Sequence, residues 1–112
     1  MSSLPLTFHR DKEGVARAVW SGEDEAASLL AQFFEAELGA DAAYCDRLLA
    51  EAHTHRQGRG PAWRTSGNLF AVSIDGSTVS LQPLFGANQS RSYTLAVAEF
   101  ARLLHNWREL VH

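Results

Sequence analysis

The chain has 112 residues, of which 46% are hydrophobic and 21% charged, values typical of one ordinary soluble domain. We therefore expect a single domain over residues 1–112 and exclude a second one. The formal net charge of −3 disfavours a general nucleic-acid-binding protein. One cysteine excludes an internal disulfide, and neither a leader pattern nor an apolar stretch of membrane-spanning length occurs, so we expect a cytoplasmic protein.

Two short apolar runs near the N-terminus, residues 4–9 and 15–20, predict a β-hairpin. The second run alternates in side-chain type with the two-residue period of a strand. The tetrapeptide DKEG at residues 11–14 separates the runs and ends in a glycine, which a type I turn tolerates at its end. We expect two antiparallel strands joined by this turn.

A helix is predicted from Ser21, its expected N-cap, to about Leu38. The acidic residues of its first turn lie where the helix dipole favours anions, and they are Glu23, Asp24 and Glu25. An apolar stripe at helical spacing follows, formed by Leu29, Leu30, Phe33, Phe34 and Leu38. Gly39 supplies a left-handed end.

A second helix is predicted from its N-cap Asp41 to near Arg56. Its apolar stripe consists of Tyr44, Cys45, Leu48, Leu49 and Ala52. Because only two or three residues join the two helices, we expect them to pack antiparallel.

The period changes from helical to two after Pro61. Residues 69–74 and 78–84 predict two strands, and the Asp75-Gly76 pair between them is a strong hairpin signal. Residues 85–92 predict a loop, residues 93–95 can add a short strand, and a final helix starts near Ala96.

The element order is therefore ββααββ(β)α. It predicts an α+β fold in which an antiparallel sheet of four to five strands packs against three helices. Neither a hairpin nor a helix pair could bury its apolar face alone, so one sheet covered on one face by the helices is the simplest arrangement.

Charge is unevenly distributed along the chain. Residues 23–51 contain eight acidic side chains and one basic side chain, so this segment carries a net charge of −7 and the remainder +4. Three arginines follow it, namely Arg56, Arg59 and Arg64. A surface with two signs of charge can steer a charged partner. The alternative is that the acids only solvate the outer faces of helices.

The histidines and the cysteine do not form a recognisable catalytic or metal pattern. His53 and His55 are two residues apart, so on a helix they point in different directions, and we expect both to be surface residues. Cys45 lies on an apolar stripe and is expected in the core. The sequence therefore predicts no metal, no cofactor and no enzymatic activity.

The three tryptophans have different expected roles. Trp107 lies on the apolar face of the last helix and is predicted to be in the core, whereas Trp20 fits either core or rim. Trp63 can form a contact cluster with Arg59 and Arg64, since tryptophan and arginine are enriched at interface hot spots. The simpler interpretation is that Trp63 starts a strand and covers the end of the sheet.

Several short motifs, in a fixed order over about a hundred residues, carry a family resemblance. They are Leu6-Thr-Phe-His-Arg-Asp11, Gly14, an alternating strand, the acidic helix pair, Trp63-x-x-x-Gly67-x-x-Phe70, Ile74-Asp-Gly76, Tyr93-Thr-Leu-Ala-Val-Ala-Glu-Phe100 and Leu103-Leu104-x-x-Trp107. In this order they resemble a small uncharacterised proteobacterial protein family whose relatives include immunity proteins of contact-dependent growth inhibition systems.

The resemblance implies an immunity protein that binds the C-terminal toxin domain of its own cell's effector, usually a nuclease, and blocks it in the cytosol as a one-to-one complex. It implies no catalytic residue. The contact residues are expected from charge instead: Glu23, Asp24, Glu35, Glu37, Asp41, Asp46 and Glu51, with Arg59, Trp63 and Arg64 as a second patch.

Other functions stay open at this point. The main alternative is an orphan cytosolic protein-binding module of the same family with no toxin partner. A small enzyme would need a histidine gathered with a carboxylate or Cys45, and a nucleic-acid-binding domain would use the +4 remainder. We expect no direct nucleic-acid or membrane contact, and the oligomeric state stays open.

Overall fold

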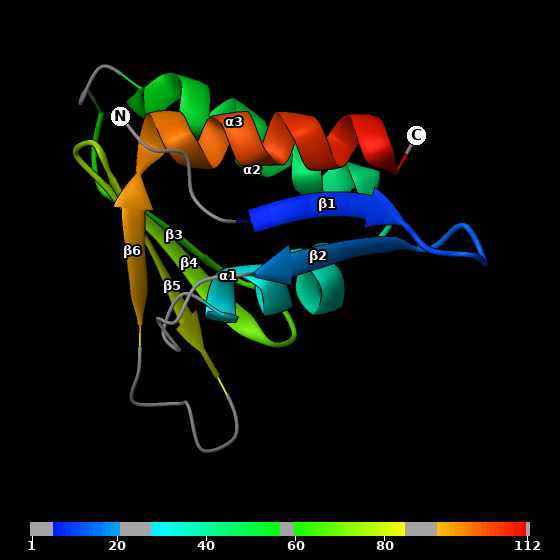
Figure 1. Cartoon of the computed structure of the whole chain (residues 1–112). Helices are drawn as coiled ribbons and strands as arrows, with labels where there is room; N and C mark the ends of the chain where they lie inside the picture. The colour runs from blue at the N-terminus through cyan, green and yellow to red at the C-terminus, as the bar shows by residue number, and fades with distance from the viewer. Residues whose placement is uncertain (1–5, 21–27, 57–59, 85–91, 112) are drawn as a thin grey trace.

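The computed structural model describes residues 6–20, 28–56, 60–84 and 92–111 (Figure 1). They form an α+β fold with three helices and two antiparallel sheets, of two and four strands, in the order ββααββββα. This confirms the predicted fold class. No helix in this part of the chain is both long and apolar enough to cross a membrane.

Strands β1 (Leu6–Arg10) and β2 (Ala16–Trp20) form the predicted hairpin, in which Leu6 pairs with Trp20. Asp11 holds the turn, because its carboxylate accepts hydrogen bonds from the backbone N–H groups of Glu13 (2.9 Å) and Val15 (3.0 Å). The hairpin forms a separate two-stranded sheet and does not join the larger one, so the expectation of a single sheet is wrong and the six strands that the structure describes are divided between two sheets. It lies along the last helix (Figure 1).

The first helix consists of α1 (Ser28–Gln32) and a continuous π-helix, η2 (Phe33–Leu38). The π-helical turn is visible in the hydrogen bond from Gly39 N–H to the Phe34 carbonyl oxygen five residues earlier (2.9 Å). Gly39 ends the helix at a positive φ of 48°, as predicted. The predicted cap Ser21 and the first-turn acids lie outside the described residues.

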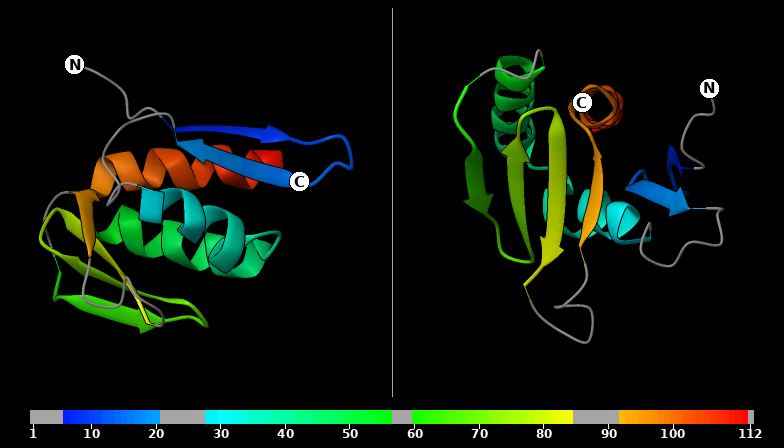
Figure 2. Two further views of the ribbon diagram at one scale, coloured as in Figure 1. Left: turned by 60° about the horizontal axis from the view of Figure 1, so that its bottom comes forward. Right: turned by 90° about the vertical axis from the view of Figure 1, so that its left-hand side faces the viewer.

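Helices α2 (Ala42–His55) and α3 (Val97–Leu110) lie side by side (Figures 1 and 2). Asp41 caps α2 as predicted, since its carboxylate accepts from Tyr44 N–H at 3.0 Å. The chain reverses direction between η2 and α2, yet α2 packs mainly on α3. Arg108 of α3 forms an ion pair with Asp46 of α2, with Nε 2.6 Å from Oδ1.

The larger sheet has the order β3-β4-β5-β6, formed by β3 (Trp63–Ser66), β4 (Phe70–Asp75), β5 (Thr78–Pro83) and β6 (Tyr93–Ala96). Trp63 starts β3, which confirms the simpler interpretation of that residue, and β6 is the optional short strand. The register aligns Trp63, Ile74, Val79 and Leu95 across the sheet. The helices lie on one side of this sheet (Figure 2).

One core joins both sheets and all helices, and Trp107 is its largest fully buried side chain. The indole ring contacts Phe8 of β1 and Phe34 of η2, with ring centroids 5.0 and 5.6 Å away, and its N–H donates to the Gly39 carbonyl oxygen at 2.8 Å. Cys45 is buried in the same core, and burial raises the pKa of its thiol to about 11. Both residues occupy the core as predicted.

We expect the substitution Trp107→Phe to lower the free energy of unfolding by about 2 to 3 kcal/mol, because the Gly39 carbonyl loses its donor and a void replaces part of the indole. Trp20→Phe is the matched control. The half-buried Trp20 indole N–H has no hydrogen-bond partner in the described part of the chain, so its loss should cost less than about 1 kcal/mol. Urea unfolding followed by circular dichroism measures the loss of stability in both variants. Equal losses would contradict the stabilising role given to the Trp107 indole and its hydrogen bond to Gly39.

Candidate functional site

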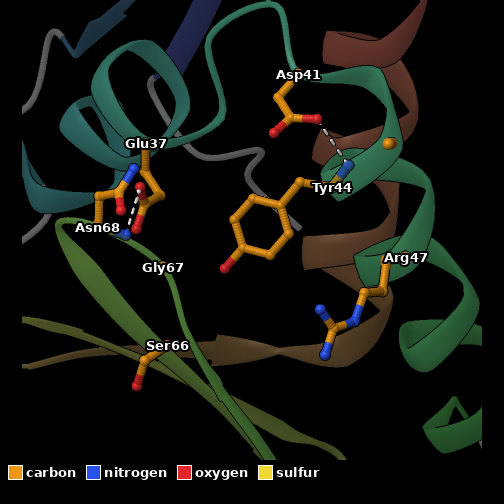
Figure 3. A pocket seen from close by; sticks show the side chains of 8 residues that line it. Glu37, Asp41, Tyr44, Arg47, Ser66, Gly67 and Asn68 are labelled. Atoms are coloured by element: carbon orange, nitrogen blue, oxygen red, sulfur yellow. Dashed lines mark hydrogen bonds between the residues drawn. The ribbon is translucent and has the colours of Figure 1, made fainter.

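A pocket of about 440 Å³ lies between η2, α2 and the turn that joins β3 to β4 (Figure 3). We call it the α2 groove. Its lining residues are Glu37, Asp41, Ala43, Tyr44, Arg47, Ser66, Gly67 and Asn68. Two carboxylates that were predicted as contact residues, those of Glu37 and Asp41, therefore meet in one place.

Glu37 is positioned by the backbone of the β3–β4 turn. Its Oε1 accepts from the N–H groups of Leu69 (3.0 Å) and Phe70 (2.9 Å), and Oε2 accepts from Asn68 N–H at 3.3 Å. Gly67 leaves room for this contact, because a Cβ there would lie 2.1 Å from Oε1. The carboxylate thus has a fixed place.

Tyr44 projects from α2 between Glu37 and Arg47, as Figure 3 shows. Its hydroxyl oxygen is buried and has no hydrogen-bond partner in the described residues. Burial raises the pKa of this hydroxyl, and the nearby Glu37 carboxylate raises it further. The group therefore stays protonated at neutral pH, and it is free to hydrogen-bond a water or a bound group.

The remaining charges occupy the two ends of the α2 groove. Asp41 is exposed at the start of α2, with one carboxylate oxygen capping the helix. Arg47 is exposed one turn beyond Tyr44, and its guanidinium carbon lies 6.0 Å from the centroid of the Trp63 ring, a cation–π distance. The end near Glu37 and Asp41 is therefore acidic, and it can accept an ammonium or guanidinium group.

The other predicted contact residues lie elsewhere. Asp46 pairs with Arg108, and Glu35 lies 3.4 Å from Arg17, so part of the acidic charge is offset inside the fold. Arg64 is exposed on the opposite face of β3 from Trp63, because side chains alternate along a strand. Glu23, Asp24 and Arg59 lie outside the described residues.

The prediction that His55 is a surface residue is wrong. Its side chain is 2% exposed, with Nδ1 2.9 Å from the Glu51 carbonyl oxygen and Nε2 2.8 Å from the Pro61 carbonyl oxygen. Since both partners are acceptors, both ring nitrogens donate only in the imidazolium form. These two carbonyls, Pro61 first, raise the pKa of His55, and the Glu51 carboxylate 4.0 Å away adds to the effect.

His53 is exposed, as predicted. Over residues 6–20, 28–56, 60–84 and 92–111, no group of three or more histidine, cysteine or acidic side chains is placed to hold a metal ion. Glu51, a further predicted contact residue, lies half-buried on α2 beside His55.

Sequence reasoning missed Tyr44 and Asn68 as site residues. Tyr44 was assigned to an apolar stripe, although its position three residues after Asp41 places both on one side of α2. No sequence pattern around Asn68 marks it as a site residue, because only the β3–β4 turn brings it to Glu37.

Comparisons with protein-family models, with curated proteins and with solved structures found no match to this chain.

We expect Glu37→Ala and Gly67→Ala each to lower the free energy of unfolding by about 1.5 to 3 kcal/mol, since each removes the carboxylate's hydrogen bonds to the turn, whereas Glu37→Gln keeps an oxygen that can accept from Leu69 and Phe70. The double variant should lose little more than either single one, because the two act on the same contact. Urea unfolding of the three variants completes the double-mutant cycle, with Ser66→Ala, at the end of β3, as the control. Fully additive losses would show that the contact does not hold the turn.

His55 should make stability depend on pH. Its contribution is fully present below the unfolded-state pKa of about 6.5 and is lost as the pH rises through the raised folded-state pKa, because the neutral ring can donate to only one carbonyl. Unfolding free energies measured in steps from about pH 5.5 upward should show the gap between wild type and His55→Gln narrowing. The exposed His53→Gln control should show no such change.

Proposed function

We propose that this chain is an immunity protein that binds and neutralises the cognate C-terminal toxin domain, a nuclease domain, of a contact-dependent growth inhibition effector in the cytoplasm. The family resemblance of the ordered motifs supports the class of function. The α2 groove is the structural observation that supports the binding mode.

The groove suits a basic side chain from the toxin. The Glu37 and Asp41 carboxylates provide opposite charge, and the Tyr44 hydroxyl oxygen can accept a hydrogen bond from an ammonium or guanidinium group. Surfaces that hold nucleic acid are rich in lysine and arginine because they neutralise phosphates. A nuclease therefore presents the kind of side chain that this groove accepts.

Preorganisation supports tight binding. Three backbone N–H groups already hold the Glu37 carboxylate, so little side-chain freedom is lost when a partner binds. Arg47 lies at the far end of the groove with its guanidinium over the Trp63 ring, and both residue types are common hot spots. Complementary charge at the acidic end also raises the association rate.

Co-purification tests the proposal directly. The chain is expressed with the C-terminal domain encoded immediately upstream, with a tag only on that domain. We expect a one-to-one complex and protection of growing cells. If both chains are soluble but neither a complex nor rescue is found, the proposal fails, and the orphan protein-binding module becomes the better interpretation.

The groove itself is tested with three substitutions that change little else. Asp41→Asn keeps the helix cap but removes the charge, Tyr44→Phe removes the hydroxyl, and Glu37→Gln removes the second charge. We expect each to weaken the complex by about tenfold or more in a titration at low salt, since hydrogen bonds to charged groups are the strong ones.

Glu13→Gln is the matched control. Glu13 is exposed in the β1–β2 turn, at the far end of the hairpin, so removing its charge should leave the affinity unchanged. A complex that forms normally with all three groove variants would show that the toxin binds another surface.

A further inference from the structure

A second groove, of about 270 Å³, lies between the C-terminal half of α2 and the N-terminal half of α3. We call it the α2–α3 groove. Its lining residues are Leu49, His53, Arg56, Ala98, Ala101, Arg102 and His105. No acidic side chain is among them, so this groove is basic where the α2 groove is acidic.

Helical spacing explains how these side chains gather. Leu49, His53 and Arg56 follow one another at intervals of four and three on α2, and the α3 residues 98, 101, 102 and 105 share one face in the same way. All four charged or titratable side chains of the groove are exposed. Two helices packed side by side therefore present their basic positions to each other.

Neighbouring acidic side chains offset only part of the positive charge in this groove. Arg102 pairs with Glu99, and His105 Nε2 lies 3.1 Å from Glu109. The Arg56 guanidinium forms no ion pair within the described residues. Arg56 also follows the C-terminus of α2, where the helix dipole stabilises a cation.

The floor of the groove is apolar and shallow. Leu49 is half-buried, and alanines 98 and 101 carry the smallest side chains that can line a helix–helix groove with a Cβ. A chain that lies here can approach the α3 backbone closely and place an apolar side chain against Leu49. The basic side chains at the edge of the groove can then contact groups of that chain on both sides of its apolar side chain.

We propose that the α2–α3 groove binds an acidic peptide segment of a partner protein, in which carboxylates flank one apolar side chain. The charge complementarity comes mainly from Arg56, with Arg102 contributing beside its partner Glu99, and the anchor site comes from Leu49 and the two alanines. The inference does not depend on the proposed immunity function, because it uses neither the resemblance nor the α2 groove.

Charge and lining both favour a peptide over nucleic acid. Proteins that bind single strands stack bases on aromatic side chains, and no aromatic residue except histidine lines this groove. A chain with a net charge of −3 is also repelled overall by a long polyanion. A short acidic segment meets only the local cations.

The test uses a fluorescein-labelled peptide in which glutamates flank a single leucine, a lysine analogue of that peptide, and a labelled single-stranded oligonucleotide. Amide chemical shifts and fluorescence anisotropy follow binding to the full chain. We expect the glutamate peptide to bind, with shifts centred on Leu49, Ala98 and Ala101, and the lysine analogue to bind there far more weakly.

Three variants and a control make the result specific to this groove. Arg56→Gln and Arg102→Gln should each weaken binding of the glutamate peptide by about fivefold to tenfold. Ala98→Gln should abolish it by filling the groove without changing charge. Lys12→Gln also removes one positive charge, but from the β1–β2 turn at the other end of the molecule, and should have no effect.

Two outcomes overturn the inference. Equal weakening by Lys12→Gln and Arg102→Gln, or no binding of the glutamate peptide, would show that the groove is not a specific site. Tighter binding of the oligonucleotide with the same dependence on Arg56 and Arg102 would assign the surface to nucleic acid. Neither outcome bears on co-purification with a toxin domain, so failure here is distinguishable from failure of the proposed function.

Discussion

The burial of Trp107 is the constraint on which the rest of the structure depends. Its ring packs against Phe8 and Phe34, which also contact each other, and its N–H donates a hydrogen bond to the carbonyl of Gly39. The β1–β2 hairpin pairs with no other strand of the described chain, and an isolated hairpin is marginally stable in water. The aromatic cluster around Trp107 therefore stabilises the hairpin and attaches it to η2 and to α3.

The same anchor determines the geometry of the candidate site. Gly39 ends η2 in a left-handed conformation, and α2 starts from the Asp41 cap only two residues later. Tyr44 is consequently one turn into α2, facing the β3–β4 turn. The π-helical turn before Gly39 places Leu38 in the core while Glu37 reaches the backbone of that turn. Core packing and the α2 groove thus share one short segment of chain.

Features set by neighbouring residues could be predicted from the sequence, and features set by distant partners could not. The Asp75-Gly76 hairpin, the Gly39 stop and the Asp41 cap depend on local chemistry, and all three are present. Strand β3 is short and polar, so it becomes a strand only by pairing with β4. The burial of His55 requires the Pro61 carbonyl, and the location of Glu37 requires the β3–β4 turn, neither of which follows from periodicity.

The net charge of a sequence segment does not by itself describe the charge of the folded surface. The acidic segment from residue 23 to 51 carries −7, yet Arg108 and Arg17 offset Asp46 and Glu35 across the fold. Helix α2 passes from an acidic groove near its start to a basic groove near its end because one face meets the β3–β4 turn and another meets α3. Since both grooves lie on one helix, their spacing and order of charge are fixed. Under the two proposals, a partner that spans both grooves would need a basic and an acidic group in the matching order, a requirement that net charge alone does not express.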